Sequence, residues 1–334
     1  MRIRSFAKIN LGIEVLGTRP DGYHDILTLF QSIDLADVLD ISEPPGREIA
    51  LSGDDPEIPW DGTNLVHRAA SLLKKETGCP KGARIAVAKS IPAGKGLGGG
   101  SSNAAAALLG LNALWGLGLG REDLARLGGR LGADVPYFLE GGLCLGEGRG
   151  DRLTPLPDLS PASVLLAFPP FPVATAEIYA AWRPSLTRLP TPPRHERRGL
   201  KSESAFQGGD ENRGSGLTPD DPRPSCREVE GLTSEDKPSK IRRFLENRDL
   251  GLLENRLEET IFRFHPQLEE YKRFFRSRGA AASLVSGTGS AVFGLFAEKA
   301  PAIEARRLLR ERVRTALVAT LSATEYARRI RAGV

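Results

Sequence analysis

The chain has 334 residues, 40% of them apolar, and a formal net charge of only +4 at pH 7. This composition is typical of a soluble globular protein and argues against a disordered chain. The basic excess is small and no basic run alternates with aromatic residues, so we expect no nucleic acid as a partner.

The cysteines and the apolar runs indicate the compartment. Cys79, Cys144 and Cys226 are widely spaced and form no CxxC pair, which is typical of proteins of the reducing cytoplasm. The apolar run 164–168 ends at two prolines and is far too short to span a membrane. Polar residues interrupt the N-terminal apolar pattern, so no signal peptide is expected. The sequence predicts a cytoplasmic protein without a membrane partner.

The N-terminal segment alternates between apolar and polar residues, which predicts a strand over residues 3–16. The alternation places Lys8 and Asn10 side by side on one face of that strand. A turn signal follows at residues 18–22, and residues 29–41 are expected to form more strand.

Helical patterns surround a glycine-rich segment in the middle of the chain. Residues 64–77 are amphipathic and end before Gly78, as helices often do. Residues 83–90 alternate and lead into the glycine-rich segment as a strand, and the apolar residues 102–115 follow it as a buried helix. A shorter helix is expected over residues 122–131.

The glycine-rich segment 92–105 is the most informative feature of the sequence. Five glycines within residues 94–100 leave its backbone free of side chains, and two serines are expected to cap the helix that follows. The free N–H groups and the positive dipole end of this helix favour an anion, most naturally a nucleotide phosphate. A flexible linker or a glycine-dense packing turn is the alternative interpretation.

Three common phosphate loops do not match this segment. A dinucleotide-binding loop needs an acidic residue at a strand end about 20 residues later, and Glu122 near that distance opens a helix instead. A protein-kinase loop needs a lysine on the following strand, but no lysine occurs between Lys95 and Lys201. A Walker A loop needs a lysine before the serine at the helix start, where this chain has Gly100-Ser101-Ser102.

The C-terminal half contains one segment of different composition. Residues from about 184 to 239 are rich in proline, glycine, serine and mixed charge, which predicts a mobile insertion. The strands and helices expected around it are strands 142–148, 164–168, 281–285, 291–297 and 317–321 and helices within 241–278 and over 301–313. The closing β-β-α-β order predicts a small α+β domain with an open sheet.

Three motifs together resemble those of the GHMP kinases, a family that includes galactokinase, homoserine kinase and mevalonate kinase. Residues 7–11 are similar to the first motif, 92–105 to the second and 286–290 to the third, in the family's order and spacing. The resemblance covers about residues 3–182 and 248–325. It implies an α+β, two-domain GHMP kinase fold, with a ribosomal protein S5 domain 2-like N-terminal domain and a ferredoxin-like C-terminal domain. We expect these domains at residues 1–155 and 156–334, the second interrupted by the insertion.

Finer features point to one branch of the family. Residues 19–24 and 132–138, together with the first motif, are similar to those of members whose acceptor is a CDP-linked methylerythritol. The resemblance implies ATP-dependent phosphorylation of a hydroxyl group of that small molecule, with Mg²⁺, on the non-mevalonate route to isoprenoid precursors. Lys95 stands where the family usually has a small residue, and we expect its ammonium group to point to water rather than to a phosphate.

Lys8 and Asp134 are the expected catalytic residues. A kinase of this type must deprotonate a hydroxyl group and stabilise charge on the transferring phosphoryl group. Asp134 is the only acidic residue between Asp123 and Glu140, and its apolar neighbours would make it a stronger base; a capping aspartate is the alternative. Lys8 interrupts an apolar strand, so it needs an anion nearby, unless it reaches solvent from an edge strand.

The binding residues follow from the loop and from the resemblance. ATP is expected along the segment made of Pro92, Gly94, Gly96, Leu97, Gly98, Gly99, Gly100, Ser101, Ser102 and Asn103. The resemblance places Asn64 near the adenine. It also implies that Tyr23 stacks on the cytosine, that His24 reads its edge, and that Tyr179, otherwise interpreted as a core residue, lies across the base. Asn10 is expected to touch the substrate, and Ser102 is one candidate ligand for Mg²⁺.

Two other functions fit parts of the sequence. Another GHMP kinase, with homoserine, mevalonate or a sugar alcohol as acceptor, would not need aromatic residues around a base. A non-catalytic nucleotide-binding protein of the same fold would not need both Lys8 and Asp134.

Overall fold

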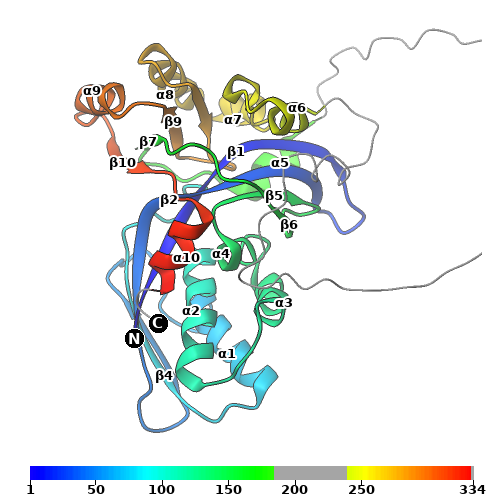
Figure 1. Ribbon diagram of the computed structural model, residues 1–334, viewed down its shortest axis with the longest axis vertical. Coiled ribbons are helices and arrows are strands. Elements are labelled where there is room, and N and C mark those ends of the chain that lie inside the picture. Colours follow the sequence, from blue (N-terminus) through cyan, green and yellow to red (C-terminus); the bar gives the residue numbers. More distant parts are fainter. Residues whose placement is uncertain (184–238, 332–334) are drawn as a thin grey trace, which may run out of the picture.

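A computed structural model of the chain describes residues 1–183 and 239–331, and in it each half of the chain builds one sheet (Figure 1). The predicted insertion at 184–239 therefore lies outside the described residues, apart from Ser239. The expected two-domain α+β fold is confirmed. None of the helices in the described part of the chain is both long and apolar enough to cross a membrane.

The N-terminal sheet has the strand order β3-β4-β2-β5-β6, with β1 paired to β2. Its strands are β1 (Arg2–Thr18), β2 (His24–Ser42), β3 (Ile49–Gly53), β4 (Ala83–Ala88), β5 (Leu143–Glu147) and β6 (Arg152–Pro155). All pairs are antiparallel except β3 with β4. The long hairpin of β1 and β2 extends from the part of the molecule around α1–α3 to the part that carries the second sheet (Figure 1).

Helices pack on the N-terminal sheet and bury one hydrophobic cluster with it. They are α1 (Leu65–Thr77), α2 (Gly99–Trp115), α3 (Arg121–Leu131), α4 (Tyr137–Glu140) and α10 (Ala323–Arg331). The sequence did not predict α10, which returns from the C-terminal half to this cluster. Its Tyr326 ring lies 5.6 Å from the ring of Phe6, and the Tyr326 hydroxyl donates a 2.6 Å hydrogen bond to Phe138 O.

The C-terminal sheet is antiparallel, with the order β10-β7-β9-β8. Its strands are β7 (Ser163–Phe168), β8 (Ala282–Val285), β9 (Val292–Phe296) and β10 (Arg314–Ala319). The helices of this half are α5 (Thr175–Ala181), α6 (Lys240–Asn247), η1 (Leu250–Leu252), α7 (Glu258–Phe264), α8 (Gln267–Ser277) and α9 (Lys299–Leu309). Helices separate β7 from β8 and β9 from β10, and this β-α-β-β-α-β succession confirms the ferredoxin-like domain.

A second hydrophobic cluster joins the two sheets and positions the site. It contains Ala7, Ile9 and Leu11 of β1 together with residues of the C-terminal sheet such as Leu166 and Phe293. Because side chains alternate along a strand, burial of these residues directs the intervening Lys8 and Asn10 away from the joint between the sheets. The apolar pattern of β1 therefore places its two polar residues.

The observed bounds differ from the sequence prediction in several elements: β2 begins earlier, at His24, and α9 ends earlier, at Leu309. Helix α2 begins at Gly99, before the two serines, because Gly98 takes the N-cap position with φ 70°. The serines therefore lie inside the first turns, and the prediction that they cap the helix is wrong. The last strand spans Arg314–Ala319, earlier than the expected residues 317–321.

Candidate active site

Lys8 lies in the middle of β1 with only 4% of its surface exposed. Its Nζ donates hydrogen bonds to Asn10 Oδ1 at 2.6 Å and to Gly96 O at 2.9 Å, and it lies 3.6 Å from Asp134 Oδ2. Burial lowers the pKa of Lys8 from its ordinary value of 10.5, whereas the nearby Asp134 carboxylate acts in the opposite direction. Oxygen atoms from three parts of the chain thus surround the ammonium group.

Asn10 fixes this ammonium group through a buried relay. Asn10 Nδ2 donates to Thr28 Oγ1 at 2.9 Å, and that hydroxyl donates to Gly12 O at 2.8 Å. The amide oxygen of Asn10 is thereby turned toward Lys8. The prediction that both residues share one face of the strand is confirmed, and one role of Asn10 is to hold Lys8.

Asp134 lies in the short connection between α3 and α4. A hydrogen bond from Val135 N to Gly132 O at 3.2 Å closes this connection, and the Val135 side chain is fully buried beneath it. The Asp134 side chain remains one-third exposed, at 33%, while the Lys8 side chain beside it is 5% exposed. The structure therefore brings together the two residues that the sequence assigned to the chemistry, and leaves the carboxylate accessible.

The glycine-rich loop covers Lys8 and packs against the third motif. Gly94, Gly96 and Gly98 have φ angles of 64°, 76° and 70°, which favour glycine. A Cβ on Gly96 would lie 2.0 Å from Ser286 O, and one on Gly98 would lie 3.3 Å from Lys8 Cε. Ser286 Oγ donates a 2.9 Å hydrogen bond to Gly96 O. The close approach of these backbones is possible only without side chains.

The polar residues at the start of α2 point into the protein. Ser102 is 2% exposed, and its Oγ donates to Phe6 O at 2.7 Å. Asn103 is 4% exposed and donates from Nδ2 to Ser5 Oγ at 2.8 Å. Ser101 differs, because its Oγ lies 4.0 Å from the position of a Cβ on Gly132, at the connection that carries Asp134. The Ser102 hydroxyl group is thus engaged with two residues of β1, Phe6 and Ser5.

Asn64, which the resemblance places near the adenine, lies beside the start of α2. Asn64 caps α1, accepting from Val66 N at 2.9 Å and donating to Pro59 O at 2.8 Å. The next residue, Leu65, has its Cδ1 3.6 Å from the position of a Cβ on Gly100. Asn64 therefore belongs to the segment beside the first turn of α2.

The predicted base-binding residues gather at the tip of the β1–β2 hairpin. Tyr23 is 57% exposed, and the Arg149 guanidinium carbon lies 5.3 Å from the centre of its ring. The rings of His24 and Tyr179 lie 5.1 Å apart at 35°, and Trp182 packs edge-on against His24 at 5.8 Å. Burial, and then the Asp134 carboxylate, raise the pKa of Tyr179. The hairpin tip and α5 together supply an aromatic end for the site.

One cavity of about 680 Å³ connects these groups. It is lined by the predicted residues Lys8, Asn10, Tyr23, His24, Gly96, Gly98, Asp134 and Tyr179. The remaining predicted residues do not line it, namely Asn64, Pro92, Gly94, Leu97, Gly99, Gly100, Ser101, Ser102 and Asn103. The cavity therefore joins the basic and acidic pair to the aromatic end, with the glycine-rich loop along its wall.

Three polar residues of the lining, Arg149, Thr175 and Thr288, were not among the site residues predicted from the sequence. Thr175 and Thr288 share a 2.8 Å hydrogen bond between their hydroxyl groups, and Arg149 is held by Asp151 at 2.7 Å. Arg149 stands between Gly148 and Gly150, so a glycine-flanked arginine at a strand end was its only local signal. Thr288 lies within the third motif, but nothing local marks Thr175, because the two threonines meet across 113 positions of sequence.

The expectation that Lys95 points to water is wrong. Its Nζ donates to Pro169 O and to Phe171 O, each at 2.7 Å. Ser290 Oγ donates to the same Phe171 carbonyl at 2.6 Å. Lys95 therefore ties the glycine-rich loop to the connection between β7 and α5 in the other half of the chain.

This contact predicts a stability effect for Lys95→Met. The substitution leaves two carbonyl groups without their charged donor, so the free energy of unfolding should fall by about 1–3 kcal/mol in urea titrations. Lys81→Met is a matched control, because Lys81 forms an exposed pair with Glu43 and such pairs contribute about 0–1 kcal/mol. Equal stability of the two variants would contradict the prediction.

Comparison with known families gives a consistent result. The signature of the GHMP kinases N terminal domain matches residues 64–142, which include the glycine-rich loop and Asp134. The signature of the GHMP kinases C terminal domain matches residues 233–315, which include the third motif. Both matches keep the order expected from the motifs.

Individual relatives match over most of the chain. Identity is 34% over 318 residues to the 4-diphosphocytidyl-2-C-methyl-D-erythritol kinase of Acaryochloris marina, covering 94% of this chain and 92% of that protein. It is 36% over 303 residues to the protein of the same name from Gloeobacter violaceus, covering 90% and 87%.

Solved structures extend the comparison. A crystal structure of 4-(cytidine 5'-diphospho)-2C-methyl-D-erythritol kinase matches with a TM-score of 0.70 and 33% identity, covering 96% of this chain and 99% of that one. A homoserine kinase from Cytophaga hutchinsonii matches with a TM-score of 0.64 at 17% identity, covering 96% and 95%, which shows the shared fold alone.

Proposed function

Because the chain belongs to the GHMP kinases, we propose that it transfers the γ-phosphoryl group of ATP to a hydroxyl group of 4-diphosphocytidyl-2-C-methyl-D-erythritol. The product is the 2-phosphate of this acceptor, an intermediate of the non-mevalonate route to isoprenoid precursors. The observation that carries the proposal is one cavity that holds the Lys8–Asp134 pair and an aromatic end of Tyr23, His24 and Tyr179.

The chemistry assigned to the pair is direct transfer. Asp134 accepts the proton of the acceptor hydroxyl group, whose oxygen then bonds to the γ-phosphorus as the bond to the departing ADP oxygen breaks. Lys8 orients the Asp134 carboxylate and places a positive charge beside the transferring group. Support comes from the 3.6 Å separation of Lys8 Nζ and Asp134 Oδ2 and from the hydrogen bonds that fix the lysine.

The buried lysine predicts an alkaline limit to activity. Since burial lowers the pKa of Lys8, it loses its proton at a lower pH than an ordinary lysine of pKa 10.5. On its alkaline side, the pH profile of kcat/KM should therefore fall as the pH rises through that lowered pKa. The residual activity of Lys8→Met should lack this fall. Circular dichroism over the same range separates the titration from unfolding, and a profile level up to pH 10.5 would refute the prediction.

We assign recognition of the base to the aromatic end of the cavity. Arg149 occupies one side of the Tyr23 ring, so the cytosine is expected on the other side, with His24 at its edge and Tyr179 opposite. The half-exposed Tyr23 ring is available for such stacking. ATP is assigned to the backbone of the glycine-rich loop, beside Asn64.

Stacking predicts a selective effect of Tyr23→Ala. Loss of a stacked ring costs about 1–3 kcal/mol, so the KM for the cytidyl substrate should rise about 5- to 150-fold while the KM for ATP stays within about 2-fold. Tyr23→Phe keeps the ring and should keep the KM for the cytidyl substrate within about 2-fold of the original value. An unchanged KM in Tyr23→Ala, measured by initial rates, would remove the stacking assignment.

Mg²⁺ is proposed to arrive with ATP, whose phosphates it bridges and neutralises. Within residues 1–183 and 239–331 no three His, Cys, Asp or Glu side chains are grouped as metal ligands, and the Ser102 hydroxyl group is engaged with β1. The described residues therefore build no site of three such ligands for the ion, and no step above runs through one.

The acceptor is the point to test first. ADP release should be measured with the CDP-linked methylerythritol, homoserine and mevalonate, each with ATP. We expect turnover with the CDP-linked compound alone. Turnover with either of the others would assign the chain to a different acceptor, and ATP binding without turnover would support a non-catalytic protein of the same fold.

We further propose a cytoplasmic enzyme without nucleic-acid or membrane partners, which the small charge excess supports.

A further inference from the structure

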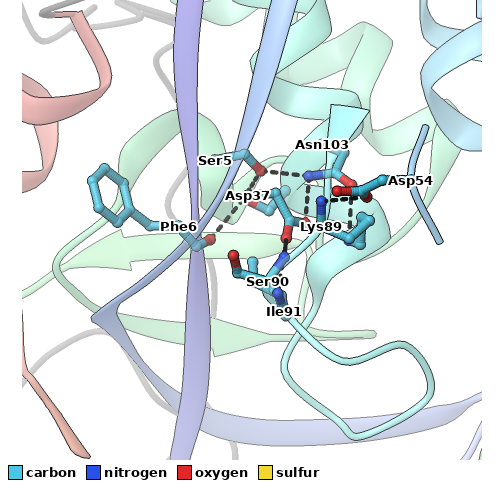
Figure 2. A network of polar contacts seen from close by, with 9 residues as sticks. Ser5, Phe6, Asp37, Asp54, Lys89, Ser90, Ile91 and Asn103 are labelled. Atoms are coloured by element: carbon cyan, nitrogen blue, oxygen red, sulfur yellow. Dashed lines mark hydrogen bonds and ion pairs between the residues drawn. The ribbon is translucent and has the colours of Figure 1, made fainter. Parts of the chain in front are cut away.

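Asp37 is a fully buried carboxylate that the chemistry proposed above does not use. It lies on β2 opposite Ser5 of β1 and is 0% exposed. Figure 2 shows it at the centre of a polar network between β1, the end of β4 and the start of α2. A carboxylate in such a position is stable only when its oxygens are satisfied, so its partners indicate its role.

One oxygen of Asp37 holds the entry to the glycine-rich loop. Asp37 Oδ1 accepts from Ser90 N at 2.7 Å and from Ile91 N at 2.8 Å. Asp54 Oδ1 accepts from the preceding amide, Lys89 N, at 2.8 Å. Three successive N–H groups are therefore bound by two carboxylates directly before Pro92, where the loop starts (Figure 2).

The other oxygen holds the far side of the loop. Asp37 Oδ2 pairs with Lys89 Nζ and accepts from Asn103 Nδ2 at 2.9 Å, while Asn103 Oδ1 accepts from Lys89 Nζ at 3.1 Å. Asn103 lies in the second turn of α2, after the non-helical part of the glycine-rich segment, residues 92–98. A single side chain thus binds the residues on both sides of the glycine-rich loop.

The network also reaches the strand that carries Lys8. Asn103 Nδ2 donates to Ser5 Oγ at 2.8 Å, Ser5 Oγ donates to Ser102 Oγ at 2.7 Å, and Ser102 Oγ donates to Phe6 O at 2.7 Å. Phe6 precedes Lys8 by two residues on β1. The position of the loop relative to the lysine therefore depends on the same set of contacts.

We propose that Asp37 is a positioning residue that holds the glycine-rich loop in its phosphate-binding shape before ATP arrives. The inference rests on the proposed function, because it assumes that this loop binds ATP. A segment with five glycines in residues 94–100 has much conformational freedom to lose on binding. Fixing its two ends in advance reduces that loss and so favours ATP binding. None of these contacts involves the aromatic residues Tyr23, His24 and Tyr179, so the KM for the cytidyl substrate serves as the internal comparison.

The test compares two double variants that both remove the buried charge pair. Asp37→Asn with Lys89→Met keeps a carbonyl oxygen for the amides of Ser90 and Ile91, whereas Asp37→Ala with Lys89→Met removes it. We expect the KM for ATP to be about 10-fold higher in the alanine variant than in the asparagine variant, with equal KM for the cytidyl substrate. Because both variants lack Lys89, loss of any contact between Lys89 and ATP affects their KM values for ATP equally and does not contribute to the difference.

Two results would overturn the proposal in this comparison. Equal KM values for ATP would show that the Asp37 acceptor does not position the loop. A parallel rise of both KM values in the alanine variant would indicate general loosening of the fold instead. Thermal unfolding of each variant reports how much folded protein contributes to the rates.

Hydrogen exchange tests the clamp without any substitution. In the nucleotide-free protein, the amides of Ser90 and Ile91 should exchange slowly, because Asp37 already binds them. Fast exchange at both amides would overturn the proposal even if neither double variant folds. Slow exchange in a protein that phosphorylates none of the tested acceptors would instead mean that the proposed function fails while the clamp remains.

Discussion

Replacing Asp134 by asparagine should lower kcat by about 10²-fold or more, while the KM for ATP stays within about 3-fold. The amide keeps the shape of the side chain but has no oxygen basic enough to accept the hydroxyl proton. The substitution removes the carboxylate beside the buried Lys8, whose ammonium group keeps its hydrogen bonds to Asn10 Oδ1 and Gly96 O, so thermal unfolding of the variant is measured alongside its rates. Steady-state rates with the CDP-linked substrate provide the measurement.

Further variants distinguish loss of the catalytic base from a general loss of activity. Asp123→Asn is a matched charge change at the start of α3, where Asp123 forms an exposed pair with Arg126, and it should leave kcat unchanged. Lys8→Met should lower kcat on a scale similar to Asp134→Asn. Because the two residues act as a unit, the double variant should be little worse than either single one. Near-normal turnover of Asp134→Asn would end its assignment as the base.

Gly96→Ala should raise the KM for ATP about 10- to 100-fold and lower kcat as well. Its Cβ would lie 2.0 Å from the backbone oxygen of Ser286, so either the glycine-rich loop or the third motif must move. Gly96 O also accepts the hydrogen bond from Lys8 Nζ, so the movement disturbs the lysine. Initial rates at varied ATP test both effects.

Gly94→Ala distinguishes the clash with Ser286 from backbone strain as the cause of the Gly96→Ala effect. Gly94 and Gly96 both have positive φ, at 64° and 76°, so an alanine at either position carries similar backbone strain. A Cβ on Gly94 would meet only Pro172 Cβ at 3.8 Å, an ordinary contact. Gly94→Ala should therefore cause a markedly smaller rise in the KM for ATP. Equal effects would attribute the loss to backbone strain rather than to the meeting of the two motifs.

The sequence pattern was sufficient to place a residue where the placement depends on one strand or helix alone. The alternation in β1 placed Lys8 and Asn10 on one face, and the structure joins their side chains at 2.6 Å. Asn64 stands at the N-cap of α1, where the predicted helix starts. The predictions failed where the hydrogen-bond partner of a side chain lies in a distant part of the chain. Lys95 took two carbonyl groups of the other half of the chain, because partly buried carbonyls and a lysine of the right length meet only after folding.

The sequence by itself determined the family, the two-domain fold and the glycine-rich loop, and it suggested Lys8 and Asp134 as the catalytic pair, because these depend on motifs and on short periodicities along one segment. The tertiary structure alone decided what surrounds them. It turned Ser102 and Asn103 into the protein, placed Arg149 against Tyr23, and bound both sides of the loop to Asp37. Those contacts join residues that are tens of positions apart, and their geometry is set by how the sheets and helices pack rather than by any local pattern.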